Sequence, residues 1–303
     1  MTIDQAKFVI GTSGYSFEDW VGTYYPAGTR TRDMFDQYVR HFRAVELNFT
    51  FYAMPFPRTL ESLARRSPEG FEFWLKANQE ITHKGNLSVC EEFVANLSPL
   101  CGAGKLAGVL LQFPQSFHRT ASSRRFLADA IDRLRAVRLA GGVNTARRPS
   151  LAAASGGGGR GWSPPTKNPT DTPNTPKTEG VRLAVEFRHR SWEDPAALAG
   201  LRERNVALVV PDEPPLEGLY HPPPTATADV AYLRLHSRDA AKWYGGMADR
   251  YDYFYSDEEL RQVLTAWSNL PQPVDKVYTF FNNCHRGQAA MNAEAFRKIL
   301  GQL

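Results

Sequence analysis

The feature that most constrains this chain is a repeated pattern, a short apolar run of strand length that ends in charged or amide side chains. The stretch over residues 181–192 shows it most clearly. Residues 183–185 are apolar, as in a strand covered on both faces, and Glu186 and Arg188 follow directly. Charges at the end of a buried strand are unfavourable unless they are paired or used. The pattern predicts either a salt-bridged rim or a functional site, and its recurrence favours a site.

Eight such strands alternate with helices along the chain. The helices are predicted over residues 31–42, 58–66, 88–100, 121–137, 195–204, after Ser256 and over 288–300. The strands are predicted over residues 7–10, 44–48, 71–76, 106–113, 183–185, 206–211, 230–235 and 276–281. This alternation indicates an α/β fold with a parallel sheet, and eight units match a closed (β/α)8 TIM-type barrel. An open doubly wound sheet is the alternative, but no GxGxxG motif follows the first strand.

Composition agrees with one large domain. The chain has 303 residues, of which 42% are hydrophobic, so a single barrel domain over residues 1–303 can bury a sizeable core. The net charge of +4 indicates no polybasic nucleic-acid arm and weakly favours anionic partners. The three cysteines form no CxxC pair, and no run of 18 apolar residues occurs. We therefore expect a cytoplasmic protein without a membrane segment.

Residues 140–180 interrupt the pattern with glycines and prolines and almost no apolar side chains. Such a stretch cannot bury enough surface to offset the entropy of ordering it. We interpret it as a low-complexity, disordered insertion before the fifth strand. A flexible basic arm that uses Arg147, Arg148 and Arg160 is the alternative.

The polar strand ends predict where the site lies, because the βα loops of a barrel converge at its C-terminal face. As candidate acids and bases we take Glu46, Glu186, Asp212 and His236. As candidate substrate-binding groups we take Asn48, Lys76, His83, Gln112, Arg188, Arg234, Tyr244, Asn282 and Asn283. The competing interpretation is a ring of inward charges that neutralise one another and close the barrel mouth.

Other patterns leave alternatives open. His83, His189 and His236 together with the carboxylates could bind a divalent metal, but HxxxH and HxH spacing is absent, and the cofactor is not predicted. The segment 282–287 leads into the last helix, whose first amides suit a phosphate. Loop aromatics could stack on sugars or bases, or simply cover the core.

The combined motifs carry a resemblance to a known family. They are IGTSGY over residues 10–15, VELN over 45–48, LQFP over 111–114, EFRH over 186–189, YLRLH over 232–236 and FNN over 281–283. With Lys76 and Ser191-Trp192, they resemble the domain of unknown function 72 (YecE-like) family over nearly the whole chain outside the insertion. The resemblance implies a TIM-type barrel with a polar pocket at the strand ends, and it implies no particular reaction. The insertion and Cys284-His285 depart from the family pattern.

Three functions follow from the candidate residues. The first is a hydrolase that acts on a phosphate-bearing or other small anionic substrate, including a phosphodiester in nucleic acid. In it, Glu46 and Glu186 serve as acid and base. The second is a glycoside hydrolase, which rests on paired carboxylates and loop aromatics. The third is a non-catalytic ligand-binding barrel. The sequence does not predict the oligomeric state.

Overall fold

The computed structural model describes residues 4–139 and 180–303, and it forms a barrel of eight parallel strands. The strands are β1 (Phe8–Thr12), β2 (Ala44–Leu47), β3 (Glu72–Lys76), β4 (Leu106–Gln112), β5 (Leu183–Glu186), β6 (Ala207–Asp212), β7 (Val230–Leu235) and β8 (Lys276–Phe281). From β2 to β8 each strand pairs with the next one in chain order, and β8 also pairs with β1. The predicted (β/α)8 fold is confirmed.

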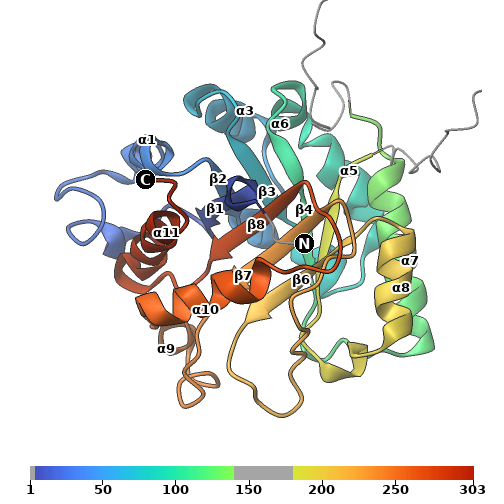
Figure 1. Cartoon of the computed structure of the whole chain (residues 1–303). Coiled ribbons are helices and arrows are strands. Elements are labelled where there is room, and N and C mark those ends of the chain that lie inside the picture. The colour runs from blue at the N-terminus through green and yellow to red at the C-terminus, as the bar shows by residue number, and fades with distance from the viewer. Residues whose placement is uncertain (1–3, 140–179) are drawn as a thin grey trace, which may run out of the picture.

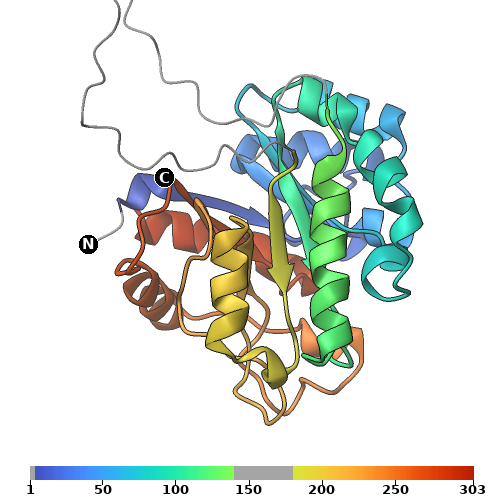
Figure 2. The ribbon, with the colours of Figure 1, turned by 90° about the vertical axis from the view of Figure 1, so that its right-hand side faces the viewer.

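The helices lie around the outside of the strands (Figure 1), and α7 and α8 pack side by side (Figure 2). The α-helices are α1 (Thr31–His41), α2 (Phe49–Tyr52), α3 (Pro57–Arg66), α4 (Gln79–Thr82), α5 (Cys90–Ala95), α6 (Ser98–Gly102), α7 (Ala121–Ala136), α8 (Pro195–Glu203), α9 (Met247–Arg250), α10 (Asp257–Trp267) and α11 (Gln288–Ile299). Of the described helices, none is both long and apolar enough to cross a lipid bilayer.

The barrel closes between β1 and β2 through a side chain and not through a regular ladder. The Tyr38 hydroxyl of α1 accepts from Thr12 N at 2.9 Å and donates to Ala44 O at 2.9 Å. Gly11 permits this approach, because a Cβ there would lie 2.3 Å from Ala44 O. Beyond the tyrosine, Gly14 N donates to Glu46 O at 2.8 Å. The closure places Glu46 next to the end of β1.

The barrel interior below the site is apolar and aromatic. Trp74, Tyr232 and Tyr278 pack edge to face, with ring centroids 4.7 and 5.2 Å from Trp74 to the two tyrosines. Gly108 leaves room for the indole, since a Cβ at that position would lie 2.5 Å from the Trp74 ring. Side chains two residues apart on a strand point to the same side. The next inward residues toward the C-terminal ends are therefore the polar ones.

One predicted helix is wrong in detail. The sequence predicts a single helix over residues 88–100, whereas α5 and α6 are separate. Pro99 stands in the first turn of α6, and a proline ring there is incompatible with a continuous helix through residue 95. Before α5, Asn86 accepts from Ser88 N through its side chain. By contrast, the Ser256–Glu259 capping box is present at the start of α10.

The predicted insertion over residues 140–180 lies, apart from Gly180, outside the described residues. The short helix α2 and the short helix α4 were not predicted. Each directly follows a strand, and four-residue helices carry too few positions for a helical period to be visible.

Candidate functional site

A buried ion cluster occupies the C-terminal end of the barrel, and Arg234 of β7 is its centre. Its guanidinium donates to Glu46 Oε1 of β2 at 2.8 Å and to Glu186 Oε2 of β5 at 2.6 Å. The remaining carboxylate oxygens also have donors. Tyr232 Oη donates to Glu46 Oε2 at 2.7 Å, and Gln112 Nε2 donates to Glu186 Oε1 at 2.6 Å. We call Glu46, Glu186 and Arg234 the Arg234 cluster.

The electrostatics of the cluster follow from burial and from mutual charge. Burial alone would lower the pKa of Arg234, but the adjacent Glu46 and Glu186 outweigh it and raise that pKa above its usual range. Burial alone would raise the pKa of Glu186, but Arg234 and then Arg188 outweigh it and hold that pKa low. Arg234, Glu46 and Glu186 are each no more than 1% exposed. The cluster is therefore a buried set of ion pairs, of which Arg234 lines the cavity described next.

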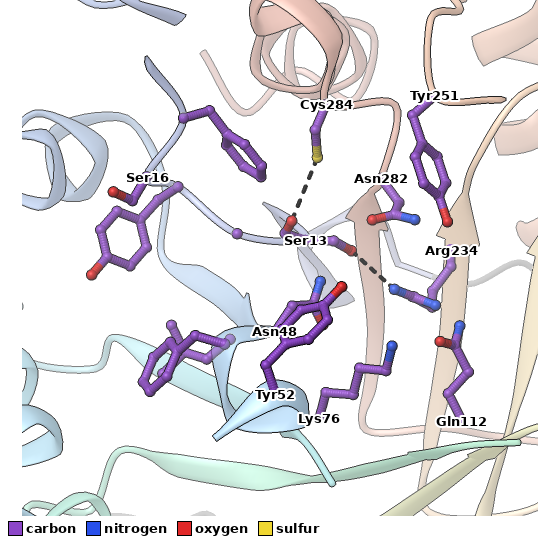
Figure 3. A pocket seen from close by; sticks show the side chains of 15 residues that line it. Ser13, Ser16, Asn48, Tyr52, Lys76, Gln112, Arg234, Tyr251, Asn282 and Cys284 are labelled. Atoms are coloured by element: carbon purple, nitrogen blue, oxygen red, sulfur yellow. Dashed lines mark hydrogen bonds between the residues drawn. The ribbon is translucent and has the colours of Figure 1, made fainter. Parts of the chain in front are cut away.

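A cavity of about 480 Å³ lies above this cluster, within the range of roughly 300–1,000 Å³ that is typical of small-molecule sites. Figure 3 shows Lys76, Gln112 and Arg234 pointing toward one another beside Tyr52. The lining residues come from the ends of β1, β2, β3, β4, β7 and β8 and from the loops after them. They are Ser13, Gly14, Tyr15, Ser16, Phe17, Leu47, Asn48, Phe49, Tyr52, Lys76, Gln112, Arg234, Tyr251, Asn282 and Cys284.

The charges that line this cavity are all positive. Lys76 and Arg234 are the ionisable bases on its wall, and the lining residues include no aspartate or glutamate. Arg188 lies next to the cluster, with its Nε 3.5 Å from Glu186 Oε1 and its side chain 29% exposed. Three cations thus face two carboxylates, and both carboxylates are already bound to Arg234.

Lys76 is the cation without a partner. Its Nζ lies 4.0 Å from the centroid of the Phe51 ring, and the described residues supply it with no hydrogen bond. Burial, and then the charges of Arg234 and Arg188, lower the pKa of Lys76 to about 7, against the opposing effect of Glu186 and Glu46. A substantial fraction of this amine is therefore neutral at physiological pH.

The cavity also brings three predicted amide side chains together, Asn48, Gln112 and Asn282. Asn48 Oδ1 is buried without a hydrogen-bond partner among the described groups. Asn282 Nδ2 lies 2.9 Å from Nδ1 of His236, which is buried behind it. Burial and then Arg234 lower the pKa of His236 well below its usual value, so this ring is neutral and positions Asn282.

Glu46, Glu186, Arg188 and His236 lie behind or beside the cavity wall, and four further predicted site residues do not line the cavity either. Asp212 accepts two hydrogen bonds from Arg238, at 2.9 and 2.8 Å, and one from Tyr255. Asn283 is buried against α11, where its Nδ2 donates to Asn292 Oδ1 at 2.9 Å. His83 packs against Phe51, and Tyr244 is 62% exposed on a loop.

The first turn of α11 also lies away from the cavity. Arg286 N donates to Asp19 Oδ2 at 2.7 Å, and a Cβ on Gly287 would lie 2.9 Å from Tyr24 Cβ. The loop after β1 therefore packs against the segment that precedes α11. Among residues 4–139 and 180–303, no group of three or more His, Cys, Asp or Glu side chains is arranged to hold a metal ion.

Sequence reasoning missed three polar side chains of this region. Tyr232 stands two residues before Arg234 on β7, so strand periodicity could have found it. Ser13 lies 3.5 Å from Arg234 through its hydroxyl and follows β1. Glu213 follows β6, and burial, then Glu186, raises its pKa to about 8, while its Oε1 is buried without a partner within the described part of the chain.

These features define a TIM-type barrel with a cationic cavity at the carboxyl ends of its strands. The family model described as "Protein of unknown function DUF72" matches residues 9–303, and the chain belongs to this family. The chain is 27% identical to UPF0759 protein YunF of Bacillus subtilis over 96% of this chain and 94% of that protein. It is 34% identical over 86 residues to UPF0759 protein YecE of Escherichia coli, which is 27% of this chain and 31% of that protein.

Solved structures of the family share the fold. A DUF72 family protein from Thermotoga maritima is 32% identical, with a TM-score of 0.76 over 97% of this chain and 99% of that chain. A second one, from Enterococcus faecalis, is 22% identical with a TM-score of 0.71 over 97% and 95% of the two chains. The second likeness concerns the fold alone.

Proposed function

We propose that this barrel is an enzyme that binds a small substrate through a phosphate or carboxylate group in the cavity above the Arg234 cluster. One observation carries the proposal. The cavity wall has two cationic side chains, Lys76 and Arg234, and no carboxylate lines it. A wall whose ionisable side chains are all cationic attracts anions. A phosphodiester presented by a nucleic acid has the same recognisable group.

The rest of the wall suits an organic body attached to the anion. Phe17, Phe49 and Tyr52 supply apolar and aromatic surface, and Asn48 and Gln112 supply amide donors and acceptors. Sites with a few convergent polar groups in a mainly apolar wall orient small molecules. The positive charge of Arg234 is fixed in place by Glu46 and Glu186, so it needs no rearrangement when the anion enters.

Proton transfer in this site falls to Lys76. The sequence suggested Glu46 and Glu186, but each of their oxygens already accepts a hydrogen bond from Arg234, Tyr232 or Gln112. An amine with a pKa of about 7 is suited to give and take a proton near neutral pH. We therefore propose that the two carboxylates position Arg234, and that Lys76 acts on the substrate.

The contacts of Glu46 and Glu186 do not fit the glycoside hydrolase hypothesis. That chemistry needs two carboxyl groups facing an open cleft with a sugar between them. Here one guanidinium bridges Glu46 and Glu186, and neither carboxylate lines the cavity.

Calorimetric titration with inorganic phosphate and with phenyl phosphate at pH 8 tests the proposal. We expect binding that takes up protons, seen as a dependence on the ionisation enthalpy of the buffer, because the bound anion favours the charged form of Lys76. Lys76→Gln should weaken binding by about tenfold or more, which is roughly 1.4 kcal/mol. The matched control is Lys84→Gln, since Lys84 lies 59% exposed and paired with Glu80. Equal phosphate affinity in wild type and Lys76→Gln would contradict the proposal.

An activity screen over phosphate esters and phosphodiesters then separates an enzyme from a binding barrel. We expect turnover in the wild type and loss of turnover in Lys76→Gln. Binding of phosphate without any turnover would support the non-catalytic barrel instead.

A further inference from the structure

Several lysines in this structure donate hydrogen bonds to oxygen atoms, and Lys76 differs from them. Lys276 donates to Glu72 at 2.6 Å, Lys84 to Glu80 at 2.6 Å, and Lys105 to backbone carbonyls of α3 and the loop after it. Lys76 comes from the end of β3 and lines the cavity, with an aromatic ring 4.0 Å from its Nζ. Its amine therefore lies at a mainly apolar cavity wall, where a ligand can reach it.

Four charged side chains act on Lys76, and none of them forms an ion pair with it. Arg234 and Arg188 oppose its charge, whereas Glu186 and Glu46 favour it. Both carboxylates are bound to Arg234, so neither makes a close ion pair with Lys76. On the remaining side, Lys76 lowers the pKa of His83, together with burial, to about 4, so that ring is neutral. A neutral amine keeps a free lone pair, and a neutral lysine in an apolar pocket is an activated nucleophile.

From this geometry we infer that Lys76 Nζ forms an imine with the carbonyl carbon of an anionic aldehyde or 2-oxo acid bound in the cavity. The inference rests on the proposed anion-binding function and names its substrate class. In this inference Arg234 on the cavity wall holds the carboxylate or phosphate arm, Arg188 adds its charge from beside Glu186, and Lys76 on the same wall reaches the carbonyl group.

The chemistry balances without another reactant. The lone pair of Nζ forms the C–N bond while the C=O π pair moves to oxygen, which takes up the proton that nitrogen loses. The carbinolamine then loses its hydroxyl group together with the remaining proton on nitrogen as water, and the nitrogen electron pair forms the C=N bond. Asn48 and Gln112 line the same cavity and are placed to hydrogen-bond the carbinolamine oxygen. The imine carries an electron-withdrawing nitrogen, so a neighbouring C–H or C–C bond becomes easier to break.

Reductive trapping tests the inference. The full chain is incubated at pH 7 with pyruvate or glyoxylate and sodium cyanoborohydride, and adducts are located by peptide mass spectrometry. We expect one dominant adduct on Lys76, because its neutral fraction exceeds that of an ordinary lysine by about a thousandfold. Inorganic phosphate should slow the adduct by competing for the same cations, and Lys84 should remain unmodified.

Lys76→Arg tests whether the adduct needs the primary amine. The variant keeps a positive charge at the cavity wall, so we expect it to keep a cooperative thermal transition and to lose the adduct, while phosphate binding is measured by calorimetry on the wild type. If wild type binds phosphate but yields no Lys76 adduct, the imine is overturned and anion binding stands. If wild type shows neither binding nor adduct, both are overturned. Adducts spread evenly over surface lysines would also overturn the imine.

Discussion

The two ends of the barrel carry ion pairs of different kinds. At the N-terminal end, Lys276 pairs with Glu72 at 2.6 Å, and Arg182 pairs with Asp229 at 3.0 Å. Each of these two cations has one carboxylate, and the Lys276 side chain is 40% exposed. At the C-terminal end, Arg234 holds two carboxylates in full burial, while Lys76 has none.

We interpret the ion pairs at the N-terminal end as stabilising, and the unpaired Lys76 at the C-terminal end as a ligand-binding group. In the two pairs at the N-terminal end, each cation is matched by one carboxylate. The C-terminal end instead keeps an unmatched amine on a cavity wall, at the face where barrel enzymes hold their sites. An uncompensated buried charge is unfavourable for folding, so such an arrangement points to a ligand that supplies the missing charge.

The largest expected effect comes from removing the centre of the cluster. Arg234→Met should lower the free energy of unfolding by about 3–5 kcal/mol, because it leaves Glu46 and Glu186 buried and without their partner. Lys276→Met at the other end should cost about 1 kcal/mol or less, because that pair is partly solvated. Urea unfolding of both variants measures the contrast, and equal losses would break the comparison between the two ends.

A pH series on Lys76→Met gives the next effect. The pKa of Lys76 falls from 10.5, its ordinary value, to about 7 in the folded chain. Between these two values the unfolded state binds more protons, so folding becomes more favourable as pH rises through that window. The free energy of unfolding of wild type relative to Lys76→Met should therefore rise by up to about 1.4 kcal/mol per pH unit from pH 7 to 10. A flat difference would show that Lys76 is not desolvated.

A smaller effect is expected from the tyrosine hydroxyls at the two ends. Tyr232→Phe removes the donor to Glu46 Oε2 and should destabilise by about 1.5–3 kcal/mol, since a hydrogen bond to a buried charge is lost. Tyr278→Phe is the matched control, because its hydroxyl lies 3.2 Å from Glu72, which keeps Lys276. Thermal unfolding should rank Tyr232→Phe well below Tyr278→Phe in stability. If Tyr278→Phe were the less stable variant, the claim that Glu46 depends more on its tyrosine hydroxyl than Glu72 does would be wrong.

Much of the architecture could be predicted from the chain because strand-length apolar runs and helical periods repeat eight times. Strand ends also predicted which residues meet, since closure of a parallel barrel brings them to one face. This reasoning gathered Glu46, Lys76, Gln112, Glu186 and Arg234 correctly at one end.

The roles within that group could not be read from the sequence. Whether Glu46 faces a ligand or pairs with Arg234 depends on a contact between two residues that are 188 positions apart in the sequence. A local sequence pattern cannot predict such a contact. The position of Asp212 at the end of β6 was also insufficient to predict its role, because Arg238 from the loop after β7 pairs with it. Pro99 broke a predicted helix that the apolar spacing alone favoured.

Direct titration of Lys76 is the measurement that tests the central claim. Heteronuclear NMR of the Lys76 side chain, assigned with Lys76→Arg, should show a pKa near 7 in the free protein. Addition of inorganic phosphate should raise that pKa, because the bound anion stabilises the ammonium. A pKa near 10.5 that phosphate leaves unchanged would contradict an unmatched, ligand-facing lysine in this barrel.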